Sequence, residues 1–429
     1  MSDRLTVVFM PESAYGPTNN CVGIGKVLEQ RGHRIVFAAE ASWAGRLEPL
    51  GFEEELVDLA PPAETEQDAG QFWTDFIIET APEFRKPTIE QLDSFIKPVW
   101  QSLVDGARYC EPRLKEILEQ VQPDVIVEDN VSCFPALLTH GVPWVRIMSC
   151  NPLELPDPAL PPKFSGHPSR DSRSWDDFRA EYERTHRELW NETNEWIVEQ
   201  GAPPLEDLEF IHESSELNLY LYPEVADYRR SRPPARTWTR LDSSVRTTEE
   251  PFTVPHSLAS SEGSALVYLS LGSLGSADID LMKRLVAALE KTPHRYIVSM
   301  GPRASEFELA DNMWGESRLP QTSIIPECDL VITHGGNNTT TECLHFGKPM
   351  IVLPLFWDQY DNAQRIDELG FGVRLDTYRF EDGDLHSALD SLLLNRELRA
   401  RMEDNGRTIR GRDGKTEAAD LIEEVGRPA

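Results

Sequence analysis

Several features that mark common protein classes are missing from this 429-residue chain. Its six cysteines show neither CxxC spacing nor a histidine at metal-ligand spacing, so neither a disulfide framework nor a zinc site is predicted. We expect them to be reduced thiols in apolar surroundings. No apolar run reaches the roughly 20 residues that a membrane span requires, and the start, MSDRLTVVFMPES, does not form a secretory signal. These absences predict a soluble, cytoplasmic protein.

Positive charge is also scarce. The chain has 42 Lys and Arg against 73 Asp and Glu, which gives a formal net charge of −31, and only nine of the basic residues are Lys. Such an acidic surface repels phosphate backbones and anionic lipid, so nucleic acid and membrane are not expected as principal partners. The charge itself is most simply a device for solubility. The length exceeds one ordinary core and therefore predicts two domains.

Short apolar runs, separated by helical patterns, fill the first half of the chain. Runs rich in β-branched residues predict buried parallel strands. The predicted strands are 5–10, 33–38, 123–129, 144–148 and 217–222, the last of which we expect to end the sheet. A helix ending near Gly32 joins the first two strands into a βαβ unit. Residues 63–120 are predicted to be largely helical. This half therefore predicts a doubly wound parallel sheet.

The pattern then changes twice before the second half begins. Residues 151–168 are Pro-rich and irregular, and a long charged helix is predicted over 175–200. Residues 229–255 are rich in Pro, Arg, Ser and Thr with little apolar periodicity, which is typical of a linker. The predicted divisions are an N-terminal domain (1–235), a linker (236–258), a second domain (259–410) and a C-terminal helix (411–429).

The second half repeats the strand and helix alternation around one distinctive stretch, 319–375. Strands are predicted at 265–270 and 295–300, with a loop at 271–275 and a helix at 278–291. Within the stretch, the run DLVIT predicts a buried strand, HGG ends it, and NNTTTE begins a helix that runs to about Phe346. A second strand is expected over 350–355. Free backbone N–H groups at the start of the central helix favour an anion, so a phosphate-bearing ligand is predicted there.

This stretch closely resembles the donor-binding signature of the UDP-glycosyltransferase family. The resemblance is carried by PQ at 320–321, HGG at 334–336, Asn338-Thr339, Glu342, GKP at 347–349, DQ at 358–359 and NA at 362–363. It implies the GT-B fold, in which two Rossmann-like domains face a cleft. The implied activity is metal-independent, inverting transfer of a hexose, most often glucose, from a UDP sugar to a small lipophilic acceptor. No cofactor beyond the nucleotide sugar is implied.

The resemblance also implies roles for individual residues. A neutral set of amides, hydroxyls and an imidazole must stabilise the leaving diphosphate in the absence of a metal. The implied donor-binding residues are Ser273, Gln321, His334, Gly336, Asn338, Thr339, Glu342, Trp357, Asp358 and Gln359. Glu342 is expected to bind the ribose hydroxyls, and Asp358 with Gln359 to read the sugar. Arg318 occupies the place where the family often has an aromatic residue against the base.

The acceptor side departs from the family pattern. The family usually has a catalytic His in the loop after the first strand, and Pro17 stands at that place in AYGPTNN. The Asp that normally pairs with this His is matched by Asp129. Asp129 is therefore one candidate base, and Glu12 is another, since it lies in the same loop. Tyr15 and Pro17 are expected to border the acceptor pocket. By the same resemblance, the insert at 151–200 either walls this pocket or forms a solvated helical hairpin.

Other motifs are interpreted more simply. Asp278-Ile279-Asp280 and Asp382-Gly383-Asp384 imitate a metal-binding DxD sequence, but each stands where an Asp caps a helix or turn, so no metal site is predicted. His33 is expected to be structural. Pro17 leaves two rival functions open: a non-catalytic relative that assists a partner transferase, and a related nucleotide-sugar epimerase or hydrolase.

Overall fold

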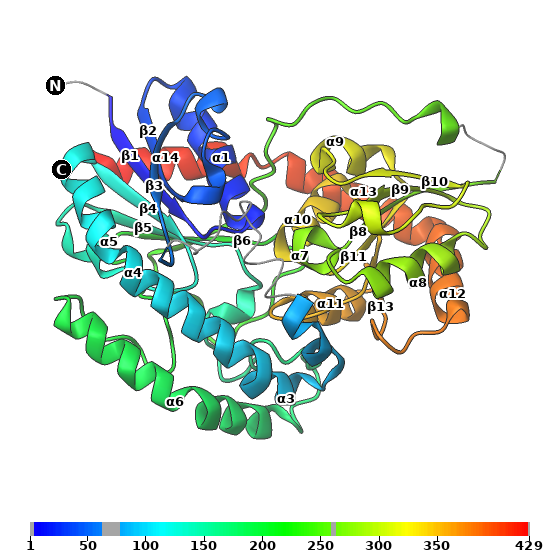
Figure 1. Cartoon of the computed structure of the whole chain (residues 1–429), viewed down its shortest axis with the longest axis horizontal. Helices are drawn as coiled ribbons and strands as arrows, with labels where there is room; N and C mark the ends of the chain where they lie inside the picture. Colours follow the sequence, from blue (N-terminus) through cyan, green and yellow to red (C-terminus); the bar gives the residue numbers. More distant parts are fainter. Residues whose placement is uncertain (1–3, 62–77, 259–262, 428–429) are drawn as a thin grey trace.

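The computed structural model describes residues 4–61, 78–258 and 263–427. It forms two α/β domains that lie side by side, each built on a twisted parallel sheet with helices on both faces (Figure 1). Of the region predicted to be helical, residues 63–77 lie outside the described part of the chain. The predicted fold class is confirmed.

The first domain has a seven-stranded sheet in the order β3-β2-β1-β4-β5-β6-β7, with every neighbouring pair parallel. The central strands are fully buried because their apolar side chains are covered on both faces. The strands are β1 Thr6–Pro11, β2 Arg34–Glu40, β3 Glu53–Val57, β4 Val125–Asp129, β5 Trp144–Met148, β6 Leu217–Leu221 and β7 Trp238–Leu241.

The second domain has a six-stranded parallel sheet in the order β10-β9-β8-β11-β12-β13. Its strands are β8 Leu266–Ser270, β9 Arg295–Ser299, β10 Met313–Glu316, β11 Leu330–Thr333, β12 Met350–Val352 and β13 Gly372–Arg374. In both sheets the strand order reverses beside the first strand, at β1/β4 and at β8/β11. Loops at the carboxyl ends of these strand pairs diverge, which is where ligands bind in open α/β sheets.

The helices connect these strands and cover both sheets. The longer ones are α1 Tyr15–Gln30, α4 Lys97–Val121, α6 Trp175–Glu199, α8 Ile279–Leu289, α10 Asn337–Phe346, α11 Gln359–Glu368, α12 Asp382–Leu393, α13 Arg396–Arg410 and α14 Gly414–Gly426. Shorter ones are α3 Thr88–Gln91, α5 Pro135–Thr139, α7 Gly272–Gly275 and α9 Gln321–Ile324. A π-helical turn, Leu92–Ile96, joins α3 to α4.

Three local expectations need correction. The first sheet does not end at β6, because β7 pairs with it inside the segment predicted as the linker. β7 is an edge strand in a Pro- and Arg-rich sequence, so it lacks the apolar run of a buried strand. The segment 271–275 forms the helical turn α7 and not an open loop. The strand expected over 350–355 ends at Val352.

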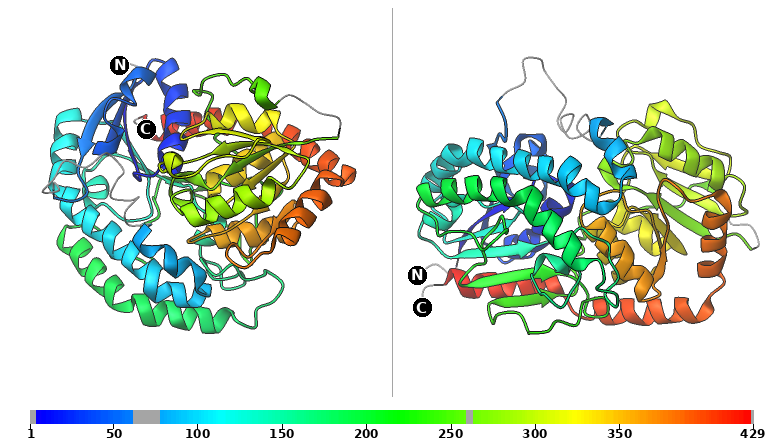
Figure 2. Two further views of the ribbon diagram at one scale, coloured as in Figure 1. Left: turned by 45° about the vertical axis from the view of Figure 1, so that its right-hand side comes forward. Right: turned by 90° about the horizontal axis from the view of Figure 1, so that it is seen from below.

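The C-terminal helix returns to the first domain. α13 packs against α10 in the second domain, and α14 then packs against α1 beside the first sheet (Figures 1 and 2). Its residues Ala418, Ala419 and Ile422 are buried in the same apolar cluster as the side chains of β1, β4, β5 and β6. The chain therefore crosses between the domains twice, once after β7 and once between α13 and α14.

Two smaller predictions concern cysteine and histidine. All six cysteines are free, and all but the half-buried Cys150 are buried. Although spacing gave no cysteine a histidine partner, Cys133 Sγ lies 3.1 Å from His212 Nδ1, and burial raises the pKa of this thiol well above its ordinary value. His33 is structural, as predicted: its Nδ1 accepts the Leu5 N–H at 3.0 Å and its Nε2 meets Glu423 of α14.

Candidate active site

The loop between β11 and α10 has a shape that only glycine permits. Gly335 has φ +87°, and a Cβ there would lie 2.7 Å from the side chain of Val352. Gly272, at the start of α7 with φ +71°, similarly leaves room for the His334 ring, since a Cβ would lie 2.8 Å from it. His334 is thus held between α7 and the start of α10. Burial lowers the pKa of His334 to about 4, although a hydrogen bond with the backbone of Ser270 opposes this shift, so the imidazole is neutral at pH 7.

The predicted ribose ligand, Glu342, is held by two partners. Gln321 Nε2 donates to Glu342 Oε2 at 2.5 Å and also to Thr339 Oγ1 at 3.1 Å. Arg246 donates to Glu342 Oε1 at 2.9 Å and forms a second ion pair with Glu249. Burial raises the pKa of Glu342, and Arg246 opposes this rise. The structure thus brings three predicted donor residues together and adds Arg246, which sequence reasoning missed.

The predicted sugar-reading residues follow β12 at the domain interface. Asp358 Oδ2 accepts the N–H of Asn151 at 2.9 Å, and Asn151 Nδ2 donates to Asn362 Oδ1 at 2.8 Å. Gln359 Oε1 accepts backbone N–H groups of the preceding turn at 3.0 and 3.3 Å. Burial raises the pKa of Asp358 to about 7. Asn151, at the start of the irregular insert, was not anticipated.

Aromatic side chains from both domains fill the space beside these residues. Trp357, which has φ +57°, places its ring centroid 4.5 Å from Phe164 and 5.1 Å from Trp100. The ring centroid of Phe356 lies 4.9 Å from that of Phe84 and 5.3 Å from that of Phe95, both of which belong to helical turns before α4. The insert therefore contributes to the interface through Phe164. Its helix α6 is not a solvated hairpin, because one face, with Phe178 and Leu189, is buried.

Glu12 and Asp129 lie together at the carboxyl ends of β1 and β4. Pro11 and Asp129 are register partners, and the Glu12 N–H donates to the Asp129 carbonyl at 2.8 Å. Burial raises the pKa of Glu12 to about 7 and that of Asp129 to about 8, the latter with help from the Glu12 charge. Ser149 donates to Asp129 Oδ2 at 2.5 Å. Two coupled carboxyl groups therefore titrate near neutral pH.

Pro17 and Tyr15 begin α1 next to this pair. Pro17 lies in the first turn of the helix and offers no proton acceptor. The Tyr15 hydroxyl accepts a hydrogen bond from Arg46 at 2.7 Å. The guanidinium of Arg318, in the second domain, lies 5.6 Å from the Tyr15 ring. Arg318, at the place where the family often has an aromatic residue against the base, therefore faces the first domain.

Other predicted donor residues have definite surroundings. The side chain of Asn338 donates to the Gly16 carbonyl at 2.9 Å and accepts from Asn20 at 2.9 Å, so its amide bridges the domains. Gly336 is the N-cap of α10, and Ser273 lies in α7. Ligand binding by these residues stays a prediction.

The DxD-like sequences serve as helix caps. Asp278 accepts the Leu281 N–H at 3.1 Å at the start of α8, and Asp384 forms a capping box with Glu381 on α12. Within residues 4–61, 78–258 and 263–427, no three His, Cys, Asp or Glu side chains are grouped to hold a metal ion. None of the helices in that same portion combines the length and the apolar character that crossing a bilayer requires.

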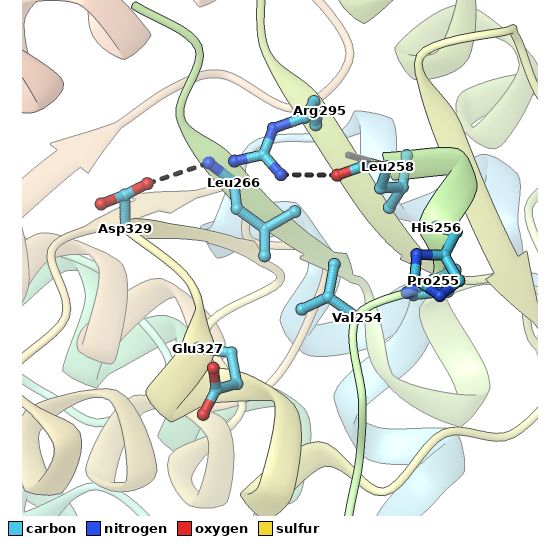
Figure 3. Close-up of a pocket in the computed structure, with 8 residues that line it drawn as sticks. All are labelled: Val254, Pro255, His256, Leu258, Leu266, Arg295, Glu327 and Asp329. Atoms are coloured by element: carbon cyan, nitrogen blue, oxygen red, sulfur yellow. Dashed lines mark hydrogen bonds between the residues drawn. The ribbon is translucent and has the colours of Figure 1, made fainter. Parts of the chain in front are cut away.

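A separate cavity of about 340 Å³ opens at the amino ends of β8, β9 and β11 (Figure 3). His334 follows the carboxyl end of β11, at the other end of these strands. Two of its polar side chains are used within the fold. Arg295 donates to the Leu258 carbonyl at 2.6 Å, and Asp329 accepts the Leu266 N–H at 2.9 Å. None of the predicted site residues lines this cavity.

Comparison with known proteins agrees with this geometry. Residues 246–402 match the family model for UDP-glucoronosyl and UDP-glucosyl transferase. The chain is 23% identical over 415 residues to NDP-glycosyltransferase YjiC of Bacillus subtilis, covering 96% of this chain and 94% of that one. It is 24% identical to zeaxanthin glucosyltransferase of Pantoea ananas, covering 94% and 91%.

A solved structure shares the whole fold. The glycosyltransferase VinC in complex with dTDP superposes with a TM-score of 0.66 over 98% of this chain and 99% of that one, at 17% identity. Two facing parallel-sheet domains, the donor loop before α10 and these relatives lead to one conclusion. The chain is a glycosyltransferase with the GT-B fold, and its residues 246–402 match the UDP-glucoronosyl and UDP-glucosyl transferase family.

Proposed function

We propose that this enzyme transfers a hexose, glucose being the first choice, from UDP-sugar to a hydroxyl of a small lipophilic acceptor such as a natural-product aglycone, with inversion at the anomeric carbon. The observation that carries the proposal is the pair formed by half-buried Glu12 and buried Asp129 at the carboxyl ends of β1 and β4. It supplies a proton acceptor at the place where Pro17 removes the family's usual one.

In the proposed reaction Asp129 takes the proton of the acceptor hydroxyl. The acceptor oxygen forms a bond to the anomeric carbon while the bond from that carbon to the diphosphate breaks, and the electron pair leaves with the diphosphate. A base whose pKa lies near the working pH suits this step, because it is available as a carboxylate and still basic enough to accept the proton. Glu12 raises the pKa of Asp129 toward that range by its charge.

The leaving diphosphate would be stabilised by groups around the start of α10. Backbone N–H groups at a helix N-terminus and the positive end of its dipole favour an anion. His334, held beside this helix N-terminus, would lie against the diphosphate. Glu342, fixed by Arg246 and Gln321, would accept the ribose hydroxyls, and Asp358 with Gln359 would bind the sugar. The whole set provides for metal-free transfer.

The lipophilic acceptor is supported by two observations. Aromatic rings, among them Trp100, Phe164 and Trp357, pack together in the interface next to Asp358 and make this region apolar. Among the relatives, zeaxanthin glucosyltransferase is named for a carotenoid acceptor. The dTDP in the VinC complex makes dTDP-glucose the alternative donor to test beside UDP-glucose.

The test measures nucleotide release from UDP-glucose and from dTDP-glucose against a panel of phenolic and macrolide-like acceptors. Wild type is compared with Asp129→Asn, Glu12→Gln and Pro17→His, and with Glu119→Gln, which changes an exposed carboxyl group on α4. We expect release that depends on the acceptor and falls at least about a hundredfold in Asp129→Asn, the usual scale for loss of a general base. Glu119→Gln should match wild type.

Other outcomes select other functions. Release that survives both Asp129→Asn and Glu12→Gln but rises in Pro17→His means that the native reaction uses no protein base. Release without any acceptor points to a hydrolase. Measurable UDP binding with no release for any acceptor identifies a non-catalytic relative that assists a partner transferase, which the proline at position 17 favours.

A further inference from the structure

Asn20, in the second turn of α1, connects three separate parts of the molecule. Its side chain is 7% exposed. Its Nδ2 donates to Ser149 Oγ at 2.8 Å, just after β5, and to Asn338 Oδ1 at 2.9 Å, in α10 of the second domain. Its Oδ1 accepts from Ser244 Oγ at 2.7 Å, in the segment between the domains. Every polar group of this amide is therefore used, and each goes to a different element.

The directions of these hydrogen bonds are fixed from one end. The carbonyl of Gly16 can only accept, so the NH₂ group of Asn338 must face it, at 2.9 Å. The carbonyl oxygen of Asn338 then faces Asn20, which must present its own NH₂ group. Since the same NH₂ group also donates to Ser149, the Ser149 oxygen acts as an acceptor towards Asn20.

Ser149 has one hydroxyl hydrogen, and this arrangement sends it to Asp129. The hydroxyl donates to Asp129 Oδ2 at 2.5 Å, and both residues are buried. A hydrogen bond donated to a carboxylate stabilises the charged form, against the cost of burying it. The carbonyl of Gly16 thus fixes the orientation of the Asn338 amide, which fixes that of the Asn20 amide. As a result, the Ser149 hydroxyl donates to the proposed base, Asp129.

We infer that Asn20 is a positioning residue that makes the ionised form of Asp129 depend on docking of α10 against α1. The inference rests on the proposed function of Asp129. When α10 is docked, Asn20 holds the Ser149 hydroxyl toward Asp129. When α10 moves away, the amide of Asn20 loses the partner that fixed its orientation, and Ser149 is no longer committed to donate. The base is then ready for proton transfer only when the donor domain is in place.

This coupling works in both directions. If docking of α10 favours ionised Asp129, then ionisation of Asp129 must favour docking by the same free energy. A ligand that binds the docked arrangement, such as UDP, should therefore bind more tightly as the pH rises through the pKa of Asp129. This effect requires no turnover.

Other charged or titratable groups face Asp129 and contribute to its titration. They are Glu12 at the end of β1, Glu128 on β4, Arg146 on β5, Cys21 on α1 and Cys150 after β5. The substitutions at Asn20 and Ser149 leave all of these groups in place. A shift of the pH profile in those variants can therefore be attributed to the hydrogen-bond chain.

The first measurement is the pH profile of kcat/KM for acceptor glycosylation. We expect Ser149→Ala to move the acid limb to higher pH by about one to two units, the loss of one hydrogen bond to a charged group. Asn20→Ala should move it in the same direction by a smaller amount, and Ser149→Thr, which keeps the hydroxyl, should restore it. Asn19→Ala is the matched control, since that half-buried neighbour on α1 has no such role, and it should leave the limb unchanged.

The second measurement is the affinity for UDP between pH 6 and pH 9, by calorimetry. Wild type should bind more tightly as the pH rises, whereas Asn20→Ala and Asp129→Asn should show a flat dependence. An unmoved acid limb in Asn20→Ala, or a wild-type UDP affinity that does not vary with pH, would overturn the inference. Full activity of Asp129→Asn would instead overturn the proposed function, while the UDP measurement still decides whether the coupling exists.

Discussion

Asp358 of the second domain accepts a hydrogen bond of 2.9 Å from the backbone N–H of Asn151 in the first. The carboxylate that is proposed to read the sugar is therefore also part of the contact between the domains. Because the bond uses only one of its two oxygens, sugar binding and domain contact can be served by the same side chain. The substitution at this position separates the two roles.

Asp358→Asn should weaken binding of UDP-glucose and leave binding of UDP nearly unchanged. The amide oxygen can still accept from Asn151, but the NH₂ group that replaces the second oxygen cannot accept from a sugar hydroxyl. A lost hydrogen bond to a charged group corresponds to about a 10- to 100-fold weaker affinity. Calorimetry with both ligands measures the difference, and Asp390→Asn, at an exposed position on α12, serves as the control. Equal weakening of both ligands would show that Asp358 does not read the sugar.

Glu12→Gln should move the acid limb of the pH profile to lower pH. The charge of Glu12 raises the pKa of Asp129, so its removal makes ionised Asp129 easier to form. Since the base must be ionised to accept a proton, activity should then persist at lower pH. Rate measurements from pH 5 to pH 9 provide the test. A loss of activity at every pH, as large as that expected for Asp129→Asn, would assign the base role to Glu12 itself.

Arg246→Met should weaken UDP binding by at least about tenfold, because it leaves the buried Glu342 without its cationic partner. Burial already raises the pKa of Glu342, and loss of the opposing Arg246 charge favours its protonated form, a poorer acceptor for ribose hydroxyls. The affinity for UDP, measured by calorimetry, gives the result. Arg303→Met removes an exposed ion pair with Glu306 on the same domain and should have little effect. An unchanged affinity in Arg246→Met would remove Glu342 from the nucleotide site.

Glu128→Gln should stabilise the protein at pH 8.5 and have a smaller effect at pH 6. Burial raises the pKa of Glu128 to about 8 and its side chain is fully buried, with Oε2 accepting from Trp144 at 3.1 Å. A raised carboxyl pKa means that the folded state holds the proton more tightly than the unfolded state. The resulting stability is fully present below about pH 4.5 and is lost as the pH rises toward 8.

The glutamine resembles the protonated form at every pH, so the unfolding midpoint should depend less on pH in the variant. Thermal unfolding at both values gives the comparison, and Glu119→Gln supplies an exposed control. If Glu128→Gln lowers the midpoint at pH 8.5, then Glu128 is stabilised as a carboxylate, contrary to the argument from burial.

The elements that sequence could predict are those with strong local patterns. The strand before the donor loop and the helix from Asn337 to Phe346 were recovered because apolar runs and capping residues lie next to each other in the chain. β3 was missed because its sequence, Glu-Glu-Glu-Leu-Val, is acidic, as an edge strand beside Arg34 can be. β7 was missed for the similar reason that its edge position does not require an apolar run.

Partners from distant parts of the chain could not be predicted. Arg246, Asn151 and Asn20 carry no motif, and each acts through a residue more than 90 positions away. Their roles arise only when the two domains meet. Where family resemblance named a residue, as for Glu342, the structure adds what holds it in place. The choice between Glu12 and Asp129 likewise depends on how they lie together at the ends of β1 and β4, which a single sequence does not reveal.

The position of α14 has a consequence for how the protein is made. Ala418, Ala419 and Ile422 complete an apolar cluster whose other members begin at Leu5. The face of the first sheet that α14 covers therefore cannot be buried as the first domain emerges from the ribosome, because α14 is synthesised only after the second domain. Burial of this face has to wait until α14 has been synthesised, and a chain that stops after α13 would leave the face exposed to aggregation.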